Sequence, residues 1–252
     1  MRHISSLVAA ASAIIALTAD AQPTPRPAKP YTPVAITLPA ASTDASFATF
    51  RAKLIAVAKS RVYVALGQLV QSQGFFWDRD FAHTFDPRRP AVDNLAAAIR
   101  LEHENGAGWD ALAAFAAEAS VEPLTSRPGI VCAPARPSYD GVAFARLLDA
   151  TYTRPVDWAY PRAVETPVCA APRPQAEVVG MHSLHFIRLL GFEGPDSEPA
   201  PGRSRWVRVG MPDAKTGYVA PGSLMSLTAE RLCYIHNLVG GWRIVGFVAA
   251  GE

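Results

Sequence analysis

The stretch Trp206–Val219, with the sequence WVRVGMPDAKTGYV, carries the clearest structural signal in the chain. Its first four residues predict a half-buried strand. Pro212 and Asp213 are typical of a turn, and Gly217–Val219 reads as the returning strand. The sequence therefore predicts an antiparallel hairpin over residues 206–219.

Further strands are predicted on both sides of this hairpin. Val178-Val179 and Leu184–Leu190 precede it, while Arg231–His236 and Trp242–Ala249 follow it. Several short strands separated by turn signals are typical of a small barrel or sandwich. We therefore expect residues 161–252 to form an all-β domain.

This C-terminal region resembles a bacterial SH3-like domain of the kind found in exported proteins of unknown function. The matching residues are Trp206, Val207 and Val209 in one strand, Pro212, Asp213 and Lys215 in the turn, and Gly217, Tyr218 and Val219 in the return. Ala214 departs from the family, whose turn usually has glycine there, so the family's turn type is not implied. The resemblance implies a barrel in the cell envelope, and related modules bind cell-wall peptides.

The last predicted strand pair has a second resemblance. The final strands of cone-shaped NTF2-like domains often end in a Gly-Trp-x-Ile strand, which matches Gly241–Ile244 here. An NTF2-like C-terminal region is therefore the alternative fold for the end of the chain.

Residues 46–121 read as a helical domain. Phe47, Phe50, Leu54 and Val57 recur at three- and four-residue spacing, which predicts one buried helix face. Residues 122–160 are expected to be a connector with one short helix from Gly141. The predicted fold class is thus α+β, with a small N-terminal helical domain followed by a C-terminal SH3-like all-β barrel.

The N-terminus has the features of a secretory signal peptide. A basic start is followed by the apolar run Leu7–Leu17 and by the small-residue pattern Ala19-Asp20-Ala21. We expect residues 1–21 to be cleaved near Ala21-Gln22, which predicts a periplasmic or extracellular protein with no membrane span in its mature chain. The proline-rich residues 22–45 are expected to be a disordered linker, at least to about Ala40.

Three cysteines in an oxidising compartment allow one disulfide, with three possible pairings. Cys169 lies among prolines, in a stretch that reads as a loop or an edge. Cys132 and Cys233 each lie within an apolar run. We therefore predict a Cys132–Cys233 disulfide.

Charge and motifs indicate a protein that is not an enzyme. The 24 basic and 22 acidic residues nearly balance, so nucleic acid is not an expected partner. No Gly-x-Ser-x-Gly motif is present, and no cysteine has the glycine-rich context of a nucleophile. The sequence predicts no catalytic residue, no cofactor and no metal site.

Aromatic side chains are the candidate ligand-binding residues, because SH3-like folds can recognise extended peptides in aromatic-lined grooves. They are Trp158, Tyr160, Trp206 and Tyr218. The expected partner is a cell-wall peptide or an envelope protein. The plainer interpretation is that most of these rings pack the core.

Two alternatives to a binding protein stay open. One is a metal-dependent or cysteine-type envelope hydrolase, for which Asp78, Asp80 and His83 would be the acidic and basic groups. His182 and His185 are a weaker pair, since strand alternation would direct them to opposite faces. The other alternative is a purely structural or interaction protein.

Overall fold

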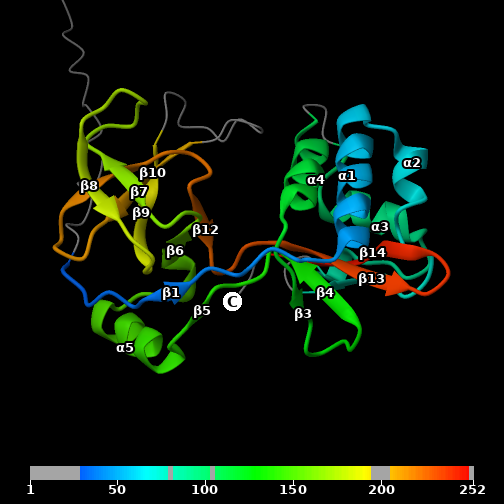
Figure 1. The fold of residues 1–252 in the computed structure, drawn as a ribbon, viewed down its shortest axis with the longest axis horizontal. Helices are drawn as coiled ribbons and strands as arrows, with labels where there is room; N and C mark the ends of the chain where they lie inside the picture. Colours follow the sequence, from blue (N-terminus) through cyan, green and yellow to red (C-terminus); the bar gives the residue numbers. More distant parts are fainter. Residues whose placement is uncertain (1–28, 79–81, 103–105, 194–204, 250–252) are drawn as a thin grey trace, which may run out of the picture.

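The computed structural model describes residues 29–78, 82–102, 106–193 and 205–249. Two lobes lie side by side (Figure 1). The helical lobe consists of helices α1 to α4 and a five-stranded sheet. The strand lobe consists of residues 29–40 and 138–226, and it holds a seven-stranded sheet and helix α5. The predicted signal peptide lies outside the described residues.

The helices of the helical lobe begin and end at recognisable signals. The Asp44 side chain accepts hydrogen bonds from the backbone N–H groups of Ser46 and Phe47, which caps α1. α1 ends at Arg61, which has a left-handed φ of 55°. Its buried side chains include the four that the spacing predicts. The helices are α1 (Ala45–Ser60), α2 (Tyr63–Gly67), α3 (Ala91–Ala98), α4 (Ala107–Ala117) and, in the strand lobe, α5 (Gly141–Thr151).

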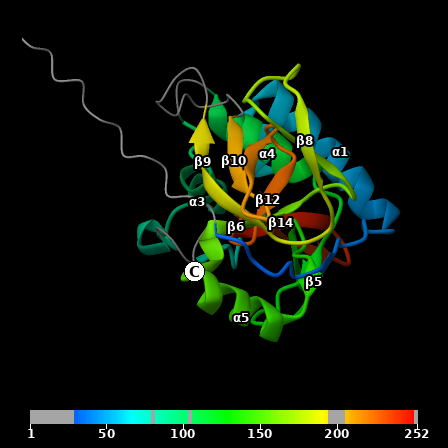
Figure 2. The same cartoon turned by 90° about the vertical axis from the view of Figure 1, so that its left-hand side faces the viewer.

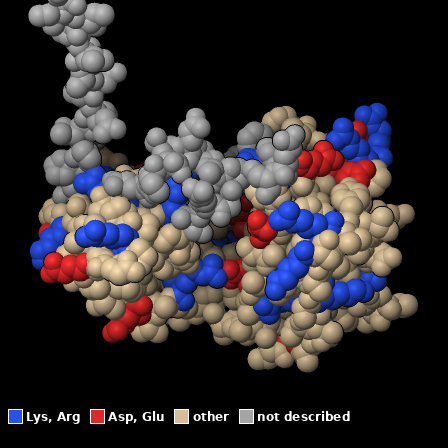
Figure 3. Space-filling model, turned by 90° about the horizontal axis from the view of Figure 1, so that it is seen from above, with Lys and Arg blue, Asp and Glu red and all other residues tan. Residues whose placement is uncertain are grey.

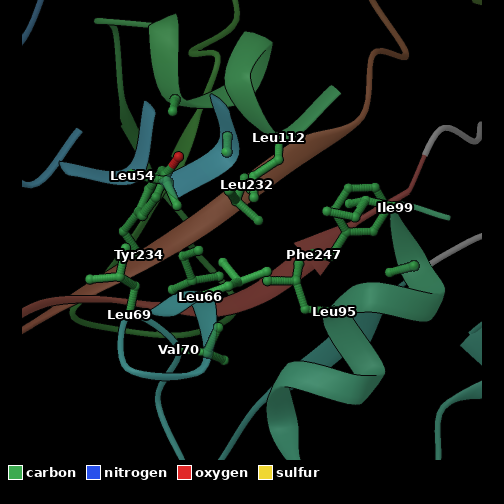
Figure 4. Packing of buried hydrophobic residues seen from close by; sticks show 14 of the residues in the cluster. Leu54, Leu66, Leu69, Val70, Leu95, Ile99, Leu112, Leu232, Tyr234 and Phe247 are labelled. Carbon is green, nitrogen blue, oxygen red and sulfur yellow. The ribbon is translucent and has the colours of Figure 1, made fainter. Parts of the chain in front are cut away.

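A five-stranded sheet lies against these helices, and its middle comes from the end of the chain. Across the sheet the strands are β2 (Phe76–Asp78), β14 (Gly241–Val248), β13 (Arg231–Asn237), β4 (Ile130–Ala133) and β3 (Glu122–Pro123). Leu232, Tyr234 and Phe247 from β13 and β14 pack against leucines from α1 to α4 in one core (Figure 4). The helices therefore share a core with the C-terminal hairpin.

This arrangement corrects the predicted fold class. A separate N-terminal helical domain is wrong, because the apolar faces of its helices are buried against strands from residues 231–248. Helical spacing identifies which side chains are buried but not which distant segment buries them. The chain is mostly β, with sheets of two, five and seven strands among the described residues.

The SH3-like barrel is also wrong, because the sheet of the strand lobe is open. Its order, from one edge to the other, is β12 (Leu224–Ser226), β6 (Trp158–Pro161), β9 (Ile187–Glu193), β10 (Trp206–Gly210), β11 (Thr216–Val219), β7 (Thr166–Cys169) and β8 (Val178–His182). The predicted hairpin over residues 206–219 is present as β10 and β11. The strand pair that was expected to complete the barrel lies in the other lobe, so β12 and β8 remain edges.

The two faces of this open sheet carry separate cores. Val207, Val209 and Val219 belong to the core on one face. On the other face, α5 and residues 31–36 cover Trp158 and Phe186. The short 3₁₀ turn Pro155–Asp157 precedes β6, and a second such turn, Ala82–Thr84, lies in the helical lobe.

The start of the described chain forms an ordered strap, defined here as residues 31–37. Its strand β1 (Ile36–Thr37) pairs with β5 (Ser138–Tyr139). The strap also exchanges backbone hydrogen bonds with residues 184–186, and the Tyr31 hydroxyl donates to the Gly210 carbonyl at 3.1 Å. Residues 29–40 of the expected disordered linker are thus packed on the strand lobe, because Tyr31, Val34 and Ile36 are buried there. Residues 22–28 lie outside the described residues.

The chain crosses between the lobes at a narrow neck. It leaves the helical lobe after β4 and returns at β13, and these two strands are neighbours in the sheet. Cys132 of β4 lies directly opposite Cys233 of β13, and the two form a disulfide. The structure therefore has the predicted cysteine pair, which links the two ends of the chain segment that forms most of the strand lobe.

Candidate functional site

A cleft of about 290 Å³ lies at the junction of the two lobes. The strand lobe contributes Leu38, Tyr160, Arg162 and Met225 to its walls, and the helical lobe contributes Glu118 and Ser120. Acidic and basic side chains also gather along this junction on the face in Figure 3. A concave site with a few converging polar groups is the usual form of a small-ligand site.

An ion pair crosses the cleft from one lobe to the other. Arg162 follows β6, and its backbone N–H donates to the Ser223 carbonyl, which fixes the chain next to β12. Its guanidinium donates to the carboxylate of Glu118, the residue that ends α4. The Arg162 side chain is 43% exposed and the Glu118 side chain 16% exposed. The pair therefore presents one positive and one negative group to the cleft.

Tyr160 also lines this cleft. Its ring is buried against α5 and the strap, in the core around Trp158. Burial, followed by the nearby Glu118 carboxylate, raises the pKa of Tyr160 to about 12. The hydroxyl therefore keeps its proton at physiological pH and can donate a hydrogen bond to a ligand.

A second group of charges supports the neck beside the cleft. Glu122 of β3 accepts hydrogen bonds from the Arg136 side chain at 2.8 Å and from the Arg136 backbone N–H at 3.0 Å. It also pairs with Arg231, whose side chain is almost fully buried at the start of β13. Arg136 lies where the chain leaves the helical lobe, and Arg231 lies where it returns. The Glu122 carboxylate therefore holds both points together. Like the disulfide, this group fixes the helical-lobe side of the junction.

Two of the four predicted aromatic ligand-binding residues, Trp158 and Tyr160, lie close together on β6. Trp158 is fully buried, and its Nε1–H donates to Thr153 Oγ1 at 2.8 Å. The centroids of the Trp158 and Tyr31 rings are 4.9 Å apart, and the two rings pack edge to face. Its contacts are those of a core residue. Of the two, only Tyr160 reaches the cleft.

The other two, Trp206 and Tyr218, lie on the neighbouring strands β10 and β11. Both are half-buried. Tyr218 is directly opposite Arg208, so Trp206, Arg208 and Tyr218 share the sheet face opposite to the valine core. In the turn between the strands, Ala214 has the left-handed φ of 68° that glycine usually takes. The turn thus keeps this conformation in spite of its Cβ atom.

The residues of the hydrolase alternative are described only in part. Asp78 pairs with Arg127 at 3.3 Å, His83 lies in a 3₁₀ turn, and Asp80 lies outside the described residues. Cys132 and Cys233 are bonded to each other, and the remaining thiol, Cys169, is buried. Within the described ranges, no three His, Cys, Asp or Glu side chains gather as a metal-ligand set.

His182 and His185 lie together, contrary to the prediction. Their ring centroids are 4.0 Å apart; β8 ends at His182, so the alternation of a strand does not continue to His185. His182 Nε2 is 2.8 Å from the His185 carbonyl oxygen. Burial, followed by the neighbouring His185, lowers the pKa of His182 to about 4. The pair lies beneath the strap, where Ala35 bridges to His185.

Comparison with known proteins identifies no similar protein. No protein-family model matches the chain, and neither the curated proteins nor the solved structures give a match. None of the helices in the described part of the chain is long and apolar enough to cross a membrane. The site is therefore interpreted from its own geometry.

Sequence reasoning missed Glu118 and Arg162. They are 44 positions apart in the sequence and belong to different lobes, and neither lies in a recognisable motif. Only the fold brings them together.

Proposed function

We propose that this protein is an exported, non-catalytic protein of the cell envelope that binds a short peptide, such as a cell-wall peptide, in the cleft between its lobes. The observation that carries the proposal is the Glu118–Arg162 pair next to the Tyr160 hydroxyl. These groups come from two lobes and converge on one concave site. A site of this kind is suited to a small polar ligand.

The chemistry of the cleft favours a peptide end over a neutral ligand. A carboxylate can accept from the Arg162 guanidinium, and an ammonium can donate to Glu118. Tyr160 can donate to the same carboxylate or to a peptide carbonyl. Leu38 and Met225 offer apolar contacts for a small side chain. The ligand would exchange partners with an existing ion pair, so we expect modest affinity and a marked dependence on salt.

Export rests on the features of residues 1–21 and is compatible with the disulfide. Disulfides persist in oxidising compartments such as the bacterial periplasm and are rare in the cytosol. The Cys132–Cys233 bond is buried and connects residues 101 positions apart. A periplasmic or extracellular location would also bring the cleft into contact with cell-wall peptides.

Calorimetry with trialanine, its C-terminal amide and its N-acetyl form tests the proposal. We expect the free peptide to bind and each blocked form to bind at least tenfold more weakly, because each loses one charge-assisted contact. Arg162→Gln should remove the preference for a free carboxylate, and Glu118→Gln the preference for a free amine. Lys215→Gln, which breaks an exposed ion pair with Asp213 in the strand lobe, is the matched control.

A second set of variants separates the cleft from the aromatic face. Retention on purified peptidoglycan should fall for Arg162→Gln and stay unchanged for a Trp206→Ala/Tyr218→Ala variant. The reverse result would move the binding site to β10 and β11. If neither trialanine nor peptidoglycan is bound by the wild type, the proposed function is wrong.

A further inference from the structure

The strap (residues 31–37) runs along the strand lobe, between α5 and the strands, and its chain continues to α1 of the helical lobe (Figures 1 and 2). Leu38 and Pro39 follow the strap directly and line the cleft. The chain is then held on the helical lobe, where the Ser42 N–H donates to the Ala119 carbonyl at 2.9 Å. One wall of the cleft is therefore a short segment that is attached to the strap at one end and to the helical lobe at the other.

Backbone hydrogen bonds attach the strap to the residues that follow β8. The Ile36 N–H donates to the Leu184 carbonyl at 3.0 Å, and the Phe186 N–H donates to the Val34 carbonyl at 3.1 Å. β1 of the strap pairs with β5 and belongs to neither of the two larger sheets. The strap can therefore detach while every strand pair of the seven-stranded sheet stays intact, and short segments of this kind open locally at a low cost in free energy.

Two histidines lie where the strap is attached. Ala35 of the strap bridges to His185, whose ring centroid is 4.0 Å from that of His182. His182 is 2% exposed, and its Nε2 atom lies 2.8 Å from the His185 carbonyl oxygen. The Nε2 atom of His185 is buried and has no hydrogen-bond partner among the described residues. A proton added to either ring of the closed strand lobe would therefore create a confined cation beside a second imidazole, which costs free energy.

Within the described ranges, the elements around the pair supply no acidic partner for such a cation. β8 contains no titratable residue besides His182, and the strap contains only Tyr31, whose pKa is raised by burial. Thr166 of β7, which lies opposite His182, is uncharged. Burial, followed by His185, lowers the pKa of His182, and burial lowers the pKa of His185. The charged groups of the surrounding elements that act on neither ring are Glu165 before β7, Arg188 of β9, and Asp213 and Lys215 of the β10–β11 turn.

We propose that acid releases the strap: a proton on the His182–His185 pair detaches residues 31–37 from the strand lobe and thereby frees the wall of the cleft at Leu38 and Pro39. In the open state both rings meet water, which stabilises their charged form. The open state therefore binds protons more readily than the closed state, and acidification shifts the equilibrium toward opening. The consequence for the cleft rests on the proposed function: the cleft holds its peptide at neutral pH and releases it in acid.

Residue-resolved hydrogen exchange at pH 7.5 and pH 5 tests the release. The amides of Ile36 and Phe186 report on the strap, because their hydrogen bonds hold it in place. After correction for intrinsic exchange rates, their protection should fall about 30-fold, which is the ratio given by a pKa of 6.5 for His182 in the open state and about 4 in the closed state. Amides of β13 in the helical lobe should keep their protection.

Three variants separate the histidines from the other contacts of the strap. His182→Gln should lose most of the pH dependence, whereas His236→Gln, at an exposed histidine of the helical lobe, should keep it. Tyr31→Phe removes the hydroxyl that donates to the Gly210 carbonyl. This variant should speed exchange of the strap amides by the same factor at both pH values. It therefore shows that these amides report on opening even if His182→Gln does not fold.

Trialanine tests the link between the strap and the cleft. A ligand that binds only the closed state stabilises that state by mass action, so trialanine at ten times its Kd should raise the protection of the Ile36 and Phe186 amides about tenfold at pH 7.5. Equal protection at both pH values overturns the inference, and so does a pH dependence that His182→Gln retains or a bound trialanine that leaves the strap amides unprotected. If calorimetry shows that trialanine does not bind, the proposed function is wrong, and the exchange at the two pH values alone decides whether acid releases the strap.

Discussion

Each lobe is completed by a segment that is distant in the sequence from the rest of that lobe, but the two segments are held in place by different interactions. The helical lobe is completed by the C-terminal hairpin, which supplies the middle of its sheet and is joined to β4 by a disulfide. The strand lobe is completed by the strap, which is held by hydrogen bonds and apolar contacts. A covalent closure resists separation under all conditions that leave it oxidised. The strap lies over the buried His182 and the half-buried His185, so we expect its closure to depend on pH.

Removing the C-terminal hairpin should have the largest effect. Deletion of residues 231–252 removes β13 and β14, and with them Leu232, Tyr234 and Phe247 from the core of the helical lobe. We expect α1 to α4 to lose cooperative unfolding, because each large apolar side chain removed costs about 2–5 kcal/mol. Thermal unfolding followed by circular dichroism measures this. Helices that still melt cooperatively would show that the hairpin is dispensable.

Removing the disulfide should weaken the helical lobe without unfolding it. The bond closes a loop of 101 residues, and loss of a native disulfide lowers the free energy of unfolding by about 2–5 kcal/mol. A Cys132→Ala/Cys233→Ala variant should show this loss in urea titrations followed by Trp fluorescence.

Addition of a reductant to the wild type should reproduce the loss, and the double variant should be insensitive to the reductant. Cys169→Ala is the control, since Cys169 is a free thiol of the strand lobe. Equal stability of oxidised and reduced wild type would contradict the role of the bond as a closure of the neck.

Acid should weaken the strand lobe first. The pKa of His182 is lowered from 6.5 to about 4 by burial and by His185, so the unfolded chain binds more protons than the folded chain between these values. Stability is therefore complete above pH 6.5 and falls as the pH drops to about 4, by about 3 kcal/mol. His182→Gln should make this dependence shallower, as measured by urea titrations from pH 7 to pH 4.

The exposed His236 of the helical lobe provides the matched control. His236→Gln should retain the full pH dependence of the wild type. If His182→Gln and wild type lose the same stability on acidification, His182 does not govern closure of the strap.

The smallest effect concerns the helical core itself. The Tyr234 hydroxyl is buried and makes no hydrogen bond to the described residues, and burial raises the pKa of Tyr234. Tyr234→Phe should therefore raise the free energy of unfolding of the helical lobe by up to about 1 kcal/mol. Urea titrations at pH 7 measure this, and a loss above about 1 kcal/mol would indicate a partner for the hydroxyl.

Local features of the chain were predictable because short-range chemistry decides them. The buried face of α1, the hairpin of β10 and β11, and the Cys132–Cys233 pair all follow from spacing, turn residues and apolar context. The candidate site was less predictable. Of the aromatic residues proposed to bind ligand, Tyr160 reaches the cleft and Trp158 is a core residue. The presence of an aromatic side chain indicates that its ring either packs in the core or contacts a ligand, but it does not distinguish between these two roles.

The sequence alone determined the buried face of α1, the hairpin over residues 206–219 and the pair of cysteines that bond. The tertiary structure alone decided which segments complete each lobe. The hairpin over residues 206–219, which suggested a closed barrel, belongs to an open sheet because the strands expected to close it pack on the helices instead. Apolar burial is non-directional, so it does not specify a partner at long range. For the same reason Glu118 and Arg162, unremarkable in the sequence, meet only when the two lobes are assembled.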